Sequence, residues 1–394
     1  MVDIHNQGAK LDMSLERYLK KLYPEDRVDI KRFIEDLQAQ GYSPARVSKY
    51  LYTLVSIKKK LKTPFKDATI EDVKRFAAKL ERSSYKAWTK SDHKTILRRY
   101  MRWLGKAETV DWLKIKRPKN GTLPEEVLVE EDVMAIVGAA YTTRDRAFVL
   151  SLYESGARIG EFLPLKIKHL SFDRHGVLVW LSGKTGDRKA RLVASTLDLQ
   201  RWLEEHPRKD DPEAYLWCKI PMPNNPKWKN RYLSYGFICR LLKELAAKAK
   251  IRKRVNPHAF RHGRATFMAR HLKEPEMRSF FGWGNDSEMP SIYVHLSGRD
   301  VDNSVLSMYG IKEAETAQTP RLKVEPCPRC HETNGPASRF CGKCGLPMGQ
   351  PYAARDKLEG LVVELLKMVA ETNPRIKEKF KEIVKEKGAE ELFA

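Results

Sequence analysis

The sequence has no run of about 18 consecutive apolar residues, and it therefore predicts no membrane-spanning helix. Its first ten residues, MVDIHNQGAK, lack the apolar core of a secretory signal. No internal repeat or low-complexity tract is visible. A G-x-x-x-x-G-K phosphate loop and an evident cluster of metal-binding carboxylates are also missing. We therefore expect a cytoplasmic protein whose chemistry uses neither ATP nor a catalytic metal ion.

Acidic residues are scarce relative to basic ones. The 394 residues include 51 Asp and Glu against 74 Lys and Arg, which gives a formal net charge of +23. A surplus of that size favours a polyanionic partner, most often nucleic acid. An anionic membrane surface and a ribosome-associated role are the alternatives that charge alone leaves open. We expect the protein to share a compartment with DNA or RNA, as a cytoplasmic, nucleoid-associated protein.

Cysteine is also rare, but four of the six cysteines stand in two CxxC pairs. In a reducing cytoplasm this pattern is typical of a metal site rather than of disulfides. Four thiolates predict tetrahedral zinc in a structural role, within a zinc ribbon at residues 325–350. The isolated Cys218 and Cys239 are expected to be free thiols. The predicted zinc ligands are Cys327, Cys330, Cys341 and Cys344.

Residues 1–107 predict a helical domain. Ser43 and Pro44 predict one helix start and Thr69 another, and apolar residues recur at helical spacing after each. The segment KAWTKSDHKTILRRYMRWLG, residues 86–105, interleaves lysine and arginine with aromatic residues. Any one such run is usually a solvated face. Several of them on one small bundle favour a clamp on the DNA backbone.

The rest of the chain divides by composition. Residues 108–126 lose the helical periodicity and contain Lys-Asn-Gly and two prolines, which predicts a linker. A second domain at 127–318 is predicted to contain helices, an antiparallel hairpin with strands around 177–181 and 191–194, and further helices. The predicted fold class is therefore mainly α with a small antiparallel β-sheet. Residues 354–394 are predicted to form amphipathic helices that pack on the body or pair with another subunit.

Four stretches of the second domain carry residue types suited to phosphate chemistry. In SGARIGEFLPL, Arg158 can aim its guanidinium at a phosphate while Glu161 steadies it. Lys184 lies in SGKTGDRK between two glycines, which allow close approach to a backbone. In NPHAFRHGRATFM, Asn-Pro predicts a helix start that places His258 and Arg261 one turn apart, at the positive end of the helix dipole. Each signal is common on its own.

The fourth stretch, FFGWGNDSEMPSIYVHLSG, contains Trp283 and Tyr293. Taken alone, the tryptophan is a core aromatic residue and the tyrosine an ordinary packed one. Their position after the other three stretches changes that interpretation. One ordered set of six residues resembles the active site of the tyrosine recombinases, the family of lambda-type integrases, Xer and Cre: Arg158, Lys184, His258, Arg261, Trp283 and Tyr293.

The motifs that carry this resemblance are ARIGE and HAFRHGRATFMAR, which are similar to the family's two arginine boxes. GWGNDSEMPSIYVHLSG looks especially like archaeal members. The resemblance covers roughly residues 12–310 and implies a helical core-binding domain before a catalytic domain. Trp283 stands where many members have a histidine, although Cre-like members also have a tryptophan there. The resemblance implies that Trp283 would hydrogen-bond a phosphate oxygen or shape the pocket. The hairpin lacks the commoner Gly-Lys-Gly, so Lys189 is an alternative to Lys184.

The resemblance also implies a mechanism. Tyr293 would attack phosphorus and form a 3′-phosphotyrosine with a free 5′-hydroxyl. Arg158 and Arg261 would stabilise the charge of the transition state. Because a tyrosine has an unperturbed pKa of about 10, its proton needs an acceptor. His258 is the predicted acceptor, with the phosphate as the alternative, and Lys184 would protonate the departing oxygen.

The predicted function is site-specific DNA recombination by the integrase of a mobile element, for integration or excision. Two alternatives stay open: a type IB topoisomerase, which uses similar residues, and a catalytically inactive, recombinase-derived DNA-binding protein. The resemblance implies double-stranded DNA with a specific site as the partner, a tetramer on DNA, and a monomer in solution. Structural zinc is the one cofactor expected, and none is expected for catalysis.

Overall fold

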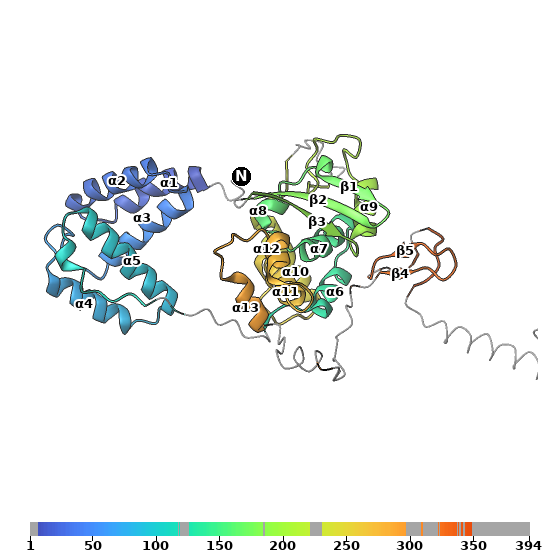
Figure 1. The fold of residues 1–394 in the computed structure, drawn as a ribbon. Coiled ribbons are helices and arrows are strands. Elements are labelled where there is room, and N and C mark those ends of the chain that lie inside the picture. The colour runs from blue at the N-terminus through green and yellow to red at the C-terminus, as the bar shows by residue number, and fades with distance from the viewer. Residues whose placement is uncertain are drawn as a thin grey trace, which may run out of the picture.

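Three bodies are visible in the computed structural model of the protein (Figure 1). Helices α1 to α5 form the first, helices α6 to α13 and strands β1 to β3 form the second, and strands β4 and β5 belong to a small third one. The predicted class, mainly α with a small antiparallel sheet, is confirmed. The predicted C-terminal helices at 354–394 lie outside the described residues, which are 7–116, 118, 126–183, 186–220, 231–296, 309, 322, 324–336, 338, 340–341 and 343–348.

The first body contains helices whose starts follow the predicted signals. Thr69 and Asp72 form a capping box at α4, because each backbone N–H is bound by the other residue's side chain. Gly41 has φ +77°, a left-handed conformation that favours glycine, and it separates α2 from α3. The helices are α1 (Gln7–Leu19), α2 (Pro24–Ala39), α3 (Pro44–Lys58), α4 (Ile70–Glu81) and α5 (Ala87–Trp103), followed by a short 3-10 turn η1 (Ala107–Thr109).

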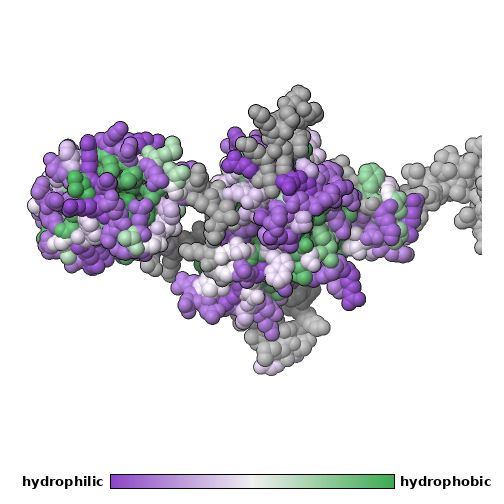
Figure 2. All heavy atoms as spheres, turned by 90° about the horizontal axis from the view of Figure 1, so that it is seen from above, coloured by the Kyte–Doolittle hydropathy of each residue, from purple (hydrophilic) through white to green (hydrophobic). Residues whose placement is uncertain are grey.

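An aromatic core holds the first body together. The ring of Phe33 meets those of Tyr50, Tyr100 and Trp103 edge to face, at centroid distances of 5.8, 5.1 and 5.3 Å. Phe33, Tyr50 and Tyr100 are buried, which contributes on the order of 1.5–3 kcal/mol for each side chain, whereas Trp103 stays partly exposed. Hydrophilic residues cover most of the face of this body that Figure 2 shows. The aromatic core therefore depends on the packing of α2, α3 and α5 on one another.

The second body is built around α7, which is buried along nearly its whole length and packs against α6, α9 and α11. Its C-terminal end therefore lies deep in the body. The helices are α6 (Glu130–Gly138), α7 (Thr143–Ser155), α8 (Ile159–Phe162), α9 (Thr196–Glu204), α10 (Tyr235–Lys248), α11 (Pro257–Met268), α12 (Glu274–Phe281) and α13 (Met289–Leu296), with a 3-10 turn η3 (Ile167–His169).

The sheet of the second body has the antiparallel order β1 (Leu170–Asp173), β2 (Gly176–Gly183) and β3 (Gly186–Leu192). Val177, Val179 and Leu181 of β2 point into the core, whereas Trp180 is exposed on the opposite face. Strand β1 was not predicted, because four residues are too few to show an alternating pattern. The hairpin strands also run further toward residues 184–185 than predicted, and those two residues lie outside the described part.

The third body contains β4 (Glu325–Pro326) and β5 (Thr333–Asn334). It lies against the second body at Gly335, where an added Cβ would come 2.7 Å from the carbonyl oxygen of Ala194. The contacted turn is itself fixed, because the buried Glu154 carboxylate accepts hydrogen bonds from the backbone N–H groups of Val193, Ala194 and Ser195. The cysteine module therefore sits on a rigid part of the second body.

Candidate active site

The first arginine of the site follows the C-terminal end of α7. Gly156 ends that helix in the left-handed conformation at φ +55°, and an added Cβ there would lie 2.4 Å from the Phe281 ring. Arg158 then immediately precedes α8 as its N-cap residue. Its guanidinium donates to the Glu161 carboxylate at 2.8 Å and, at 3.3 Å, to the carbonyl oxygen of Gly282. Its side chain remains about one-third exposed (35%), so it can still reach a ligand.

The second arginine lies on α11. The Asn256 side chain accepts from the Ala259 N–H and Pro257 is the first helical residue, which confirms the predicted helix start. Arg261 is 3% exposed and donates to the carbonyl oxygens of Gly156 at 2.8 Å and Phe281 at 2.7 Å. Burial, with the nearby positive charge of Arg158, lowers the pKa of Arg261 to about 9. The guanidinium remains charged at neutral pH.

A third arginine, which sequence reasoning missed, joins the same group. The side chain of Arg188 of β3 is 9% exposed, donates to the carbonyl oxygen of Phe280, and reaches the Glu161 carboxylate at 3.3 Å. Burial lowers the pKa of Arg188, and the Glu161 carboxylate opposes that effect. Strand alternation was the signal that could have found it, since position 188 shares the inward face of β3 with the buried Ala190 and Leu192.

The three arginines converge on the C-terminal end of α12. Phe280, Phe281 and Gly282 are consecutive, and their carbonyl oxygens accept from Arg188, Arg261 and Arg158 respectively. The last carbonyls of a helix have no partner within it, and they carry the negative end of its dipole. They satisfy the guanidinium groups without cancelling their charge. The Glu161 carboxylate binds two of the three cations, Arg158 and Arg188. This cluster is suited to an anion such as a phosphate.

The candidate nucleophile, Tyr293 of α13, is 1% exposed. Its ring stacks on that of Trp283 at 5.4 Å with an interplanar angle of 4°, and Trp283 stacks in turn on Phe281 at 4.8 Å. Burial raises the pKa of Tyr293 to about 12, and the charge of Arg261 opposes that rise. The predicted tryptophan is thus a packing partner of the predicted tyrosine, and both are linked to the arginine cluster through the end of α12.

A second residue that sequence reasoning missed is His262. Its Nδ1 lies 2.5 Å from the Tyr293 hydroxyl oxygen. His258, which was the predicted proton acceptor, lies one turn earlier, and its ring centroid is 4.2 Å from that of His262. Burial, together with the charge of Arg261, lowers the pKa of His258. The sequence contained a signal, because the histidine directly after Arg261 is one turn from His258 on the same helix.

The predicted lysine, Lys184, lies outside the described residues. Its alternative, Lys189, lies on the outer face of the sheet, where its Nζ stands 3.9 Å from the centre of the Trp180 ring. That face is opposite to the one from which Arg188 reaches Glu161. Lys189 therefore already has a partner, and it points away from the arginine cluster.

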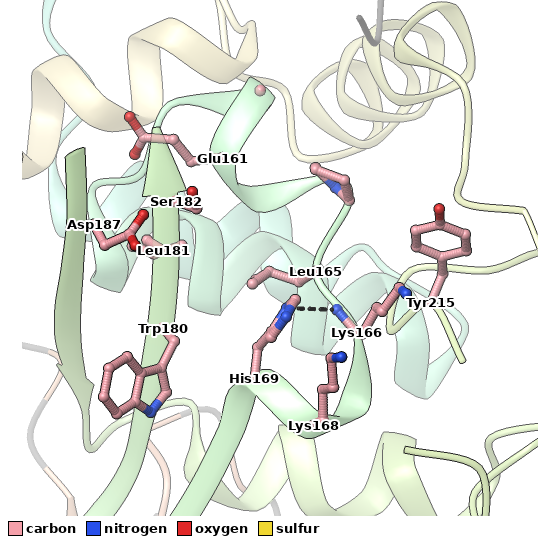
Figure 3. A pocket seen from close by; sticks show the side chains of 12 residues that line it. Glu161, Leu165, Lys166, Lys168, His169, Trp180, Leu181, Ser182, Asp187 and Tyr215 are labelled. Carbon is pink, nitrogen blue, oxygen red and sulfur yellow. Dashed lines mark hydrogen bonds between the residues drawn. The ribbon is translucent and has the colours of Figure 1, made fainter. Parts of the chain in front are cut away.

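A cavity of about 920 Å³ opens elsewhere on the second body (Figure 3). Trp180, Ser182 and Asp187 lie on its strand side, and Lys166 and His169 lie across from them. Glu161 is the one member of the arginine cluster that it reaches. His258, Arg261 and Tyr293 do not line this cavity, so we do not assign it to the predicted reaction.

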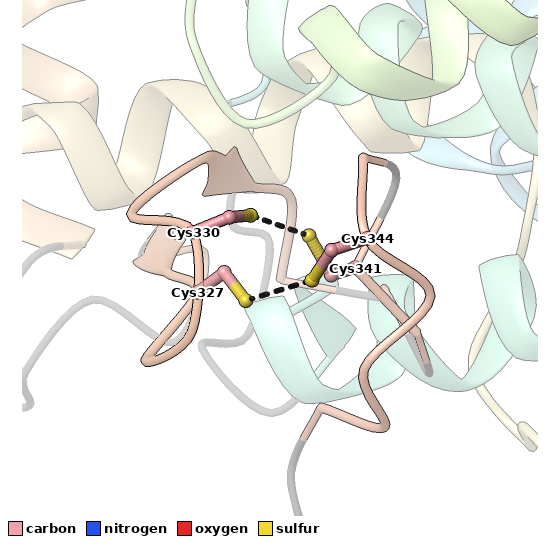
Figure 4. A group of neighbouring side chains, drawn as sticks. All are labelled: Cys327, Cys330, Cys341 and Cys344. Atoms are coloured by element: carbon pink, nitrogen blue, oxygen red, sulfur yellow. Dashed lines mark hydrogen bonds between the residues drawn. The ribbon is translucent and has the colours of Figure 1, made fainter.

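The four predicted zinc ligands come together in the third body (Figure 4). Their sulfur atoms all lie within 4.8 Å of one another, with Cys327 and Cys344 at 3.5 Å and Cys330 and Cys341 also at 3.5 Å. Thiolates at such spacing fit a tetrahedral metal site. Gly345, at φ +72°, supplies a tight turn next to Cys344. None of the helices in the described part of the chain has the length and apolar character that crossing a membrane requires.

Comparison with known proteins places this geometry in a family. Residues 126–299 match the phage integrase family, and residues 30–109 match its N-terminal SAM-like domain. The chain is 31% identical over 244 residues to the tyrosine recombinase XerA of Pyrococcus furiosus, an alignment that covers 61% of this chain and 79% of that protein. The XerA of Pyrococcus horikoshii is 29% identical over 241 residues, with 61% and 79% covered. The chain belongs to the phage integrase family of tyrosine recombinases.

Solved structures agree on the fold. A XerH site-specific recombinase bound to palindromic difH substrate has a TM-score of 0.55 at 17% identity, covering 76% of this chain and 89% of that one. A lambda integrase dimer bound to a COC′ core site also has a TM-score of 0.55, at 15% identity, covering 69% and 78%. Both comparisons extend well beyond the second body alone, and they support the same fold, in which a helical body is followed by one with helices and a small sheet.

Proposed function

We propose that the protein cuts and rejoins DNA at a specific site through a covalent link to Tyr293. The hydroxyl oxygen would attack phosphorus, form a 3′-phosphotyrosine and release a 5′-hydroxyl. The phosphodiester bond energy is kept in the covalent link, so the cycle needs no ATP. One observation carries the proposal: Arg158 and Arg261 meet at the end of α12, immediately before the Trp283 ring that stacks on Tyr293.

The remaining roles follow from charge and position. Arg158 and Arg261 would neutralise the non-bridging oxygens and stabilise the transition state. His258, at the N-terminal end of α11, would donate a hydrogen bond to the same phosphate. Lys184 would protonate the departing 5′-oxygen, and the engagement of Lys189 with Trp180 favours Lys184 over its alternative. Trp283 would hold the tyrosine ring in register with the arginines.

The proposed partner is double-stranded DNA carrying a recombination site. The net charge of +23 favours a polyanion. Solved relatives include a XerH recombinase bound to its difH substrate and a lambda integrase tetramer bound to a Holliday junction. A tetramer on DNA and a location at the nucleoid are therefore the assembly and the place that we propose. Integration or excision of a mobile element is the proposed biological use.

We propose the following division of the chain: a DNA clamp at 1–107, a linker at 108–126, a catalytic domain at 127–318 and a zinc ribbon at 325–350. Two separate cores support it, one formed by helices α1 to α5 and one formed around α7. The clamp would hold the side of the duplex that the catalytic domain does not. The segment at 354–394 would form amphipathic helices that pack on the body or pair with another subunit.

A nicked suicide substrate carrying the attachment site tests the reaction. The native protein should form a covalent protein–DNA adduct, and Tyr293→Phe should form none. Tyr309, which is described and exposed, provides the matched control, because Tyr309→Phe should leave the adduct intact. An adduct that survives Tyr293→Phe would contradict the assignment. Relaxation of supercoiled DNA without a specific site would favour the topoisomerase alternative, and site binding without any adduct would favour the inactive one.

We also propose that the cysteine cluster holds structural zinc. The spacing of the four sulfur atoms supports it, and with all four positions filled by thiolates no site remains open for catalysis. Metal analysis of the purified protein should find one zinc per chain, and Cys341→Ser should lower that content. Chelation should unfold the third body while Tyr293 keeps its reactivity. Immediate loss of cleavage from a still folded protein would contradict a purely structural role.

A further inference from the structure

The hydroxyl of Tyr293 has a specific partner. The ring is enclosed by the stack on Trp283, while the hydroxyl oxygen lies 2.5 Å from Nδ1 of His262. Both residues belong to helices that pack on each other, α11 and α13. The contact joins positions 31 residues apart in the chain. It therefore depends on the docking of α13 and is not a local consequence of either helix.

The direction of this hydrogen bond follows from the protonation states of the two groups. Burial raises the pKa of Tyr293 to about 12, so the phenol is protonated at neutral pH. Burial, with the neighbouring His258 and Arg261, lowers the pKa of His262 to about 4, so the imidazole is neutral. The phenol O–H therefore donates to Nδ1, and the imidazole proton lies on Nε2.

We propose that His262 is a catalytic residue that accepts the proton of Tyr293 during DNA cleavage. This rests on the proposed function of Tyr293. As the O–P bond forms, the phenol O–H bond breaks and its proton moves to Nδ1, which leaves an imidazolium. The P–O5′ bond breaks at the same time, and the departing oxygen takes its proton from Lys184. On rejoining, the 5′-hydroxyl gives its proton back to Lys184 and displaces the tyrosine oxygen from phosphorus, and His262 returns its proton to the tyrosine oxygen.

Geometry favours His262 over His258 for this role. His262 contacts the Tyr293 hydroxyl, whereas the ring of His258 packs against the ring of His262. His258 is one turn closer to the N-terminal end of α11, where an anion is best held. The two histidines would therefore divide the work, with one on the phosphate and the other on the nucleophile.

The positive surroundings of His262 provide a reason for the base to act when DNA is bound. His258 and Arg261 are the charged or titratable neighbours that oppose its protonation, and Tyr293 faces it from α13. A bound phosphodiester brings a negative charge to the same cluster. That charge offsets the repulsion between the arginine and an imidazolium, so proton acceptance becomes easier in the complex than in the free protein.

The first test is single-turnover cleavage of the suicide substrate by His262→Asn. Asparagine keeps a hydrogen-bond acceptor near the position of Nδ1 but cannot take a proton. The expected loss is about 10²–10³-fold in the cleavage rate, within the range of general base catalysis, with site binding unchanged. His271→Asn is the matched control, because His271 contacts the ring of Phe267 instead, and it should cleave like the native protein. A native cleavage rate in His262→Asn overturns the proposal.

The second test separates proton transfer from positioning. A ring-fluorinated tyrosine at position 293 has a lower phenol pKa and needs less help from a base. It should restore most of the rate lost in His262→Asn. If the fluorinated residue leaves the defect unchanged, His262 only positions the ring and the proposal is wrong. A 5′-bridging phosphorothiolate substrate, whose sulfur leaves without a proton, should not rescue this variant.

A third measurement needs no substitution of His262, so it decides the matter even if the asparagine variant is unfolded. The cleavage rate of the native protein should fall as the pH is lowered, because a protonated His262 accepts no proton. The fall should largely disappear with fluorinated tyrosine at position 293. A flat profile in the native protein, or an unchanged fall in the fluorinated one, overturns the proposal. If Tyr293→Phe itself forms an adduct, the proposed function has failed instead.

Discussion

The two large bodies of the molecule use positive charge in different ways. In the first body, lysines pair with carboxylates: Lys49 pairs with Asp92 at the surface at 2.6 Å, and Lys58 pairs with Asp26 in the interior at 3.0 Å. In the second body, Arg188 and Arg261 are buried and bound to backbone carbonyls. Surface pairs are solvated and easily screened, whereas the buried arginines are held in one geometry.

The choice of acceptor explains what the buried arrangement achieves. A carboxylate both satisfies a guanidinium and cancels its charge, whereas a carbonyl only satisfies it. With three arginines around the single carboxylate of Glu161, the cluster keeps a net positive charge in a place where water is largely excluded. Such charges stabilise a developing negative charge more strongly than solvated ones. The surface lysines instead suit long-range attraction of a polyanion.

The strongest test of this difference is Arg261→Lys. The charge is kept, but one ammonium cannot reach the carbonyl oxygens of Gly156 and Phe281 in the same way and still face a phosphate. We expect the cleavage rate to fall about 10²–10³-fold, the range seen when one preorganised transition-state donor is removed, with DNA binding nearly unchanged. Arg264→Lys is the control on the same helix, since its partner is Glu130, outside the cluster. A native cleavage rate in Arg261→Lys would show that charge alone suffices.

A smaller effect is expected from Arg188→Met, which keeps the length of the side chain and removes its donors. Phe280 loses a donor and Glu161 loses one of its two arginines, so Glu161 should bind Arg158 more tightly and pull it from the phosphate. We expect about a tenfold slower cleavage, which corresponds to about 1.4 kcal/mol. Arg191→Met, on the same strand but paired at the surface with Asp173, is the control. Equal cleavage rates in Arg188→Met and Arg191→Met would show that Arg188 has no role in cleavage.

The free energy of unfolding should fall in acid because His262 is buried in its neutral form. The folded pKa of His262 is about 4, below its ordinary value of 6.5. Between these values the unfolded chain binds a proton that the folded one does not, so stability falls as the pH drops from 6.5 through about 4. Urea unfolding of the native protein should therefore weaken over this range relative to His262→Asn. If the free energy of unfolding depends on pH in the same way in both proteins, His262 is not held in its neutral form.

The smallest effect is expected in the first body. Lys49→Ala should change the free energy of unfolding by less than about 1 kcal/mol, because the Lys49–Asp92 pair is partly exposed and screened by salt. Urea unfolding at low and high salt measures this, and any difference should shrink as salt is added. If Lys49 also contacts a phosphate, the Lys49→Ala variant should release about one counterion fewer when it binds DNA. The slope of its binding constant against salt concentration, on logarithmic axes, should then be shallower by about one. A larger loss of stability that persists in salt would mean that this surface pair behaves like the buried arginines.

Local signals predicted the individual elements well. The Asn256 and Pro257 start of α11 and the start of α4 after Thr69 were both confirmed. Each depends on hydrogen bonds within a few residues, which is why sequence alone suffices. Strand β1 was missed because its short exposed run forms only through pairing with β2. The roles of the candidate site residues remain predictions that the proposed experiments test.

By itself, the sequence determined which groups the protein has available: the order of arginine, histidine, tryptophan and tyrosine, the four cysteines, and the helix that carries His258 and Arg261 on one face. Tertiary structure decided which of them meet. The contact between Tyr293 and His262 exists only when α13 packs on α11, and Arg188 and Arg158 meet at Glu161 only when α8 packs on β2, the strand paired with β3. The physical reason is that a buried polar group must find a partner, and packing of distant segments determines which partner is within reach.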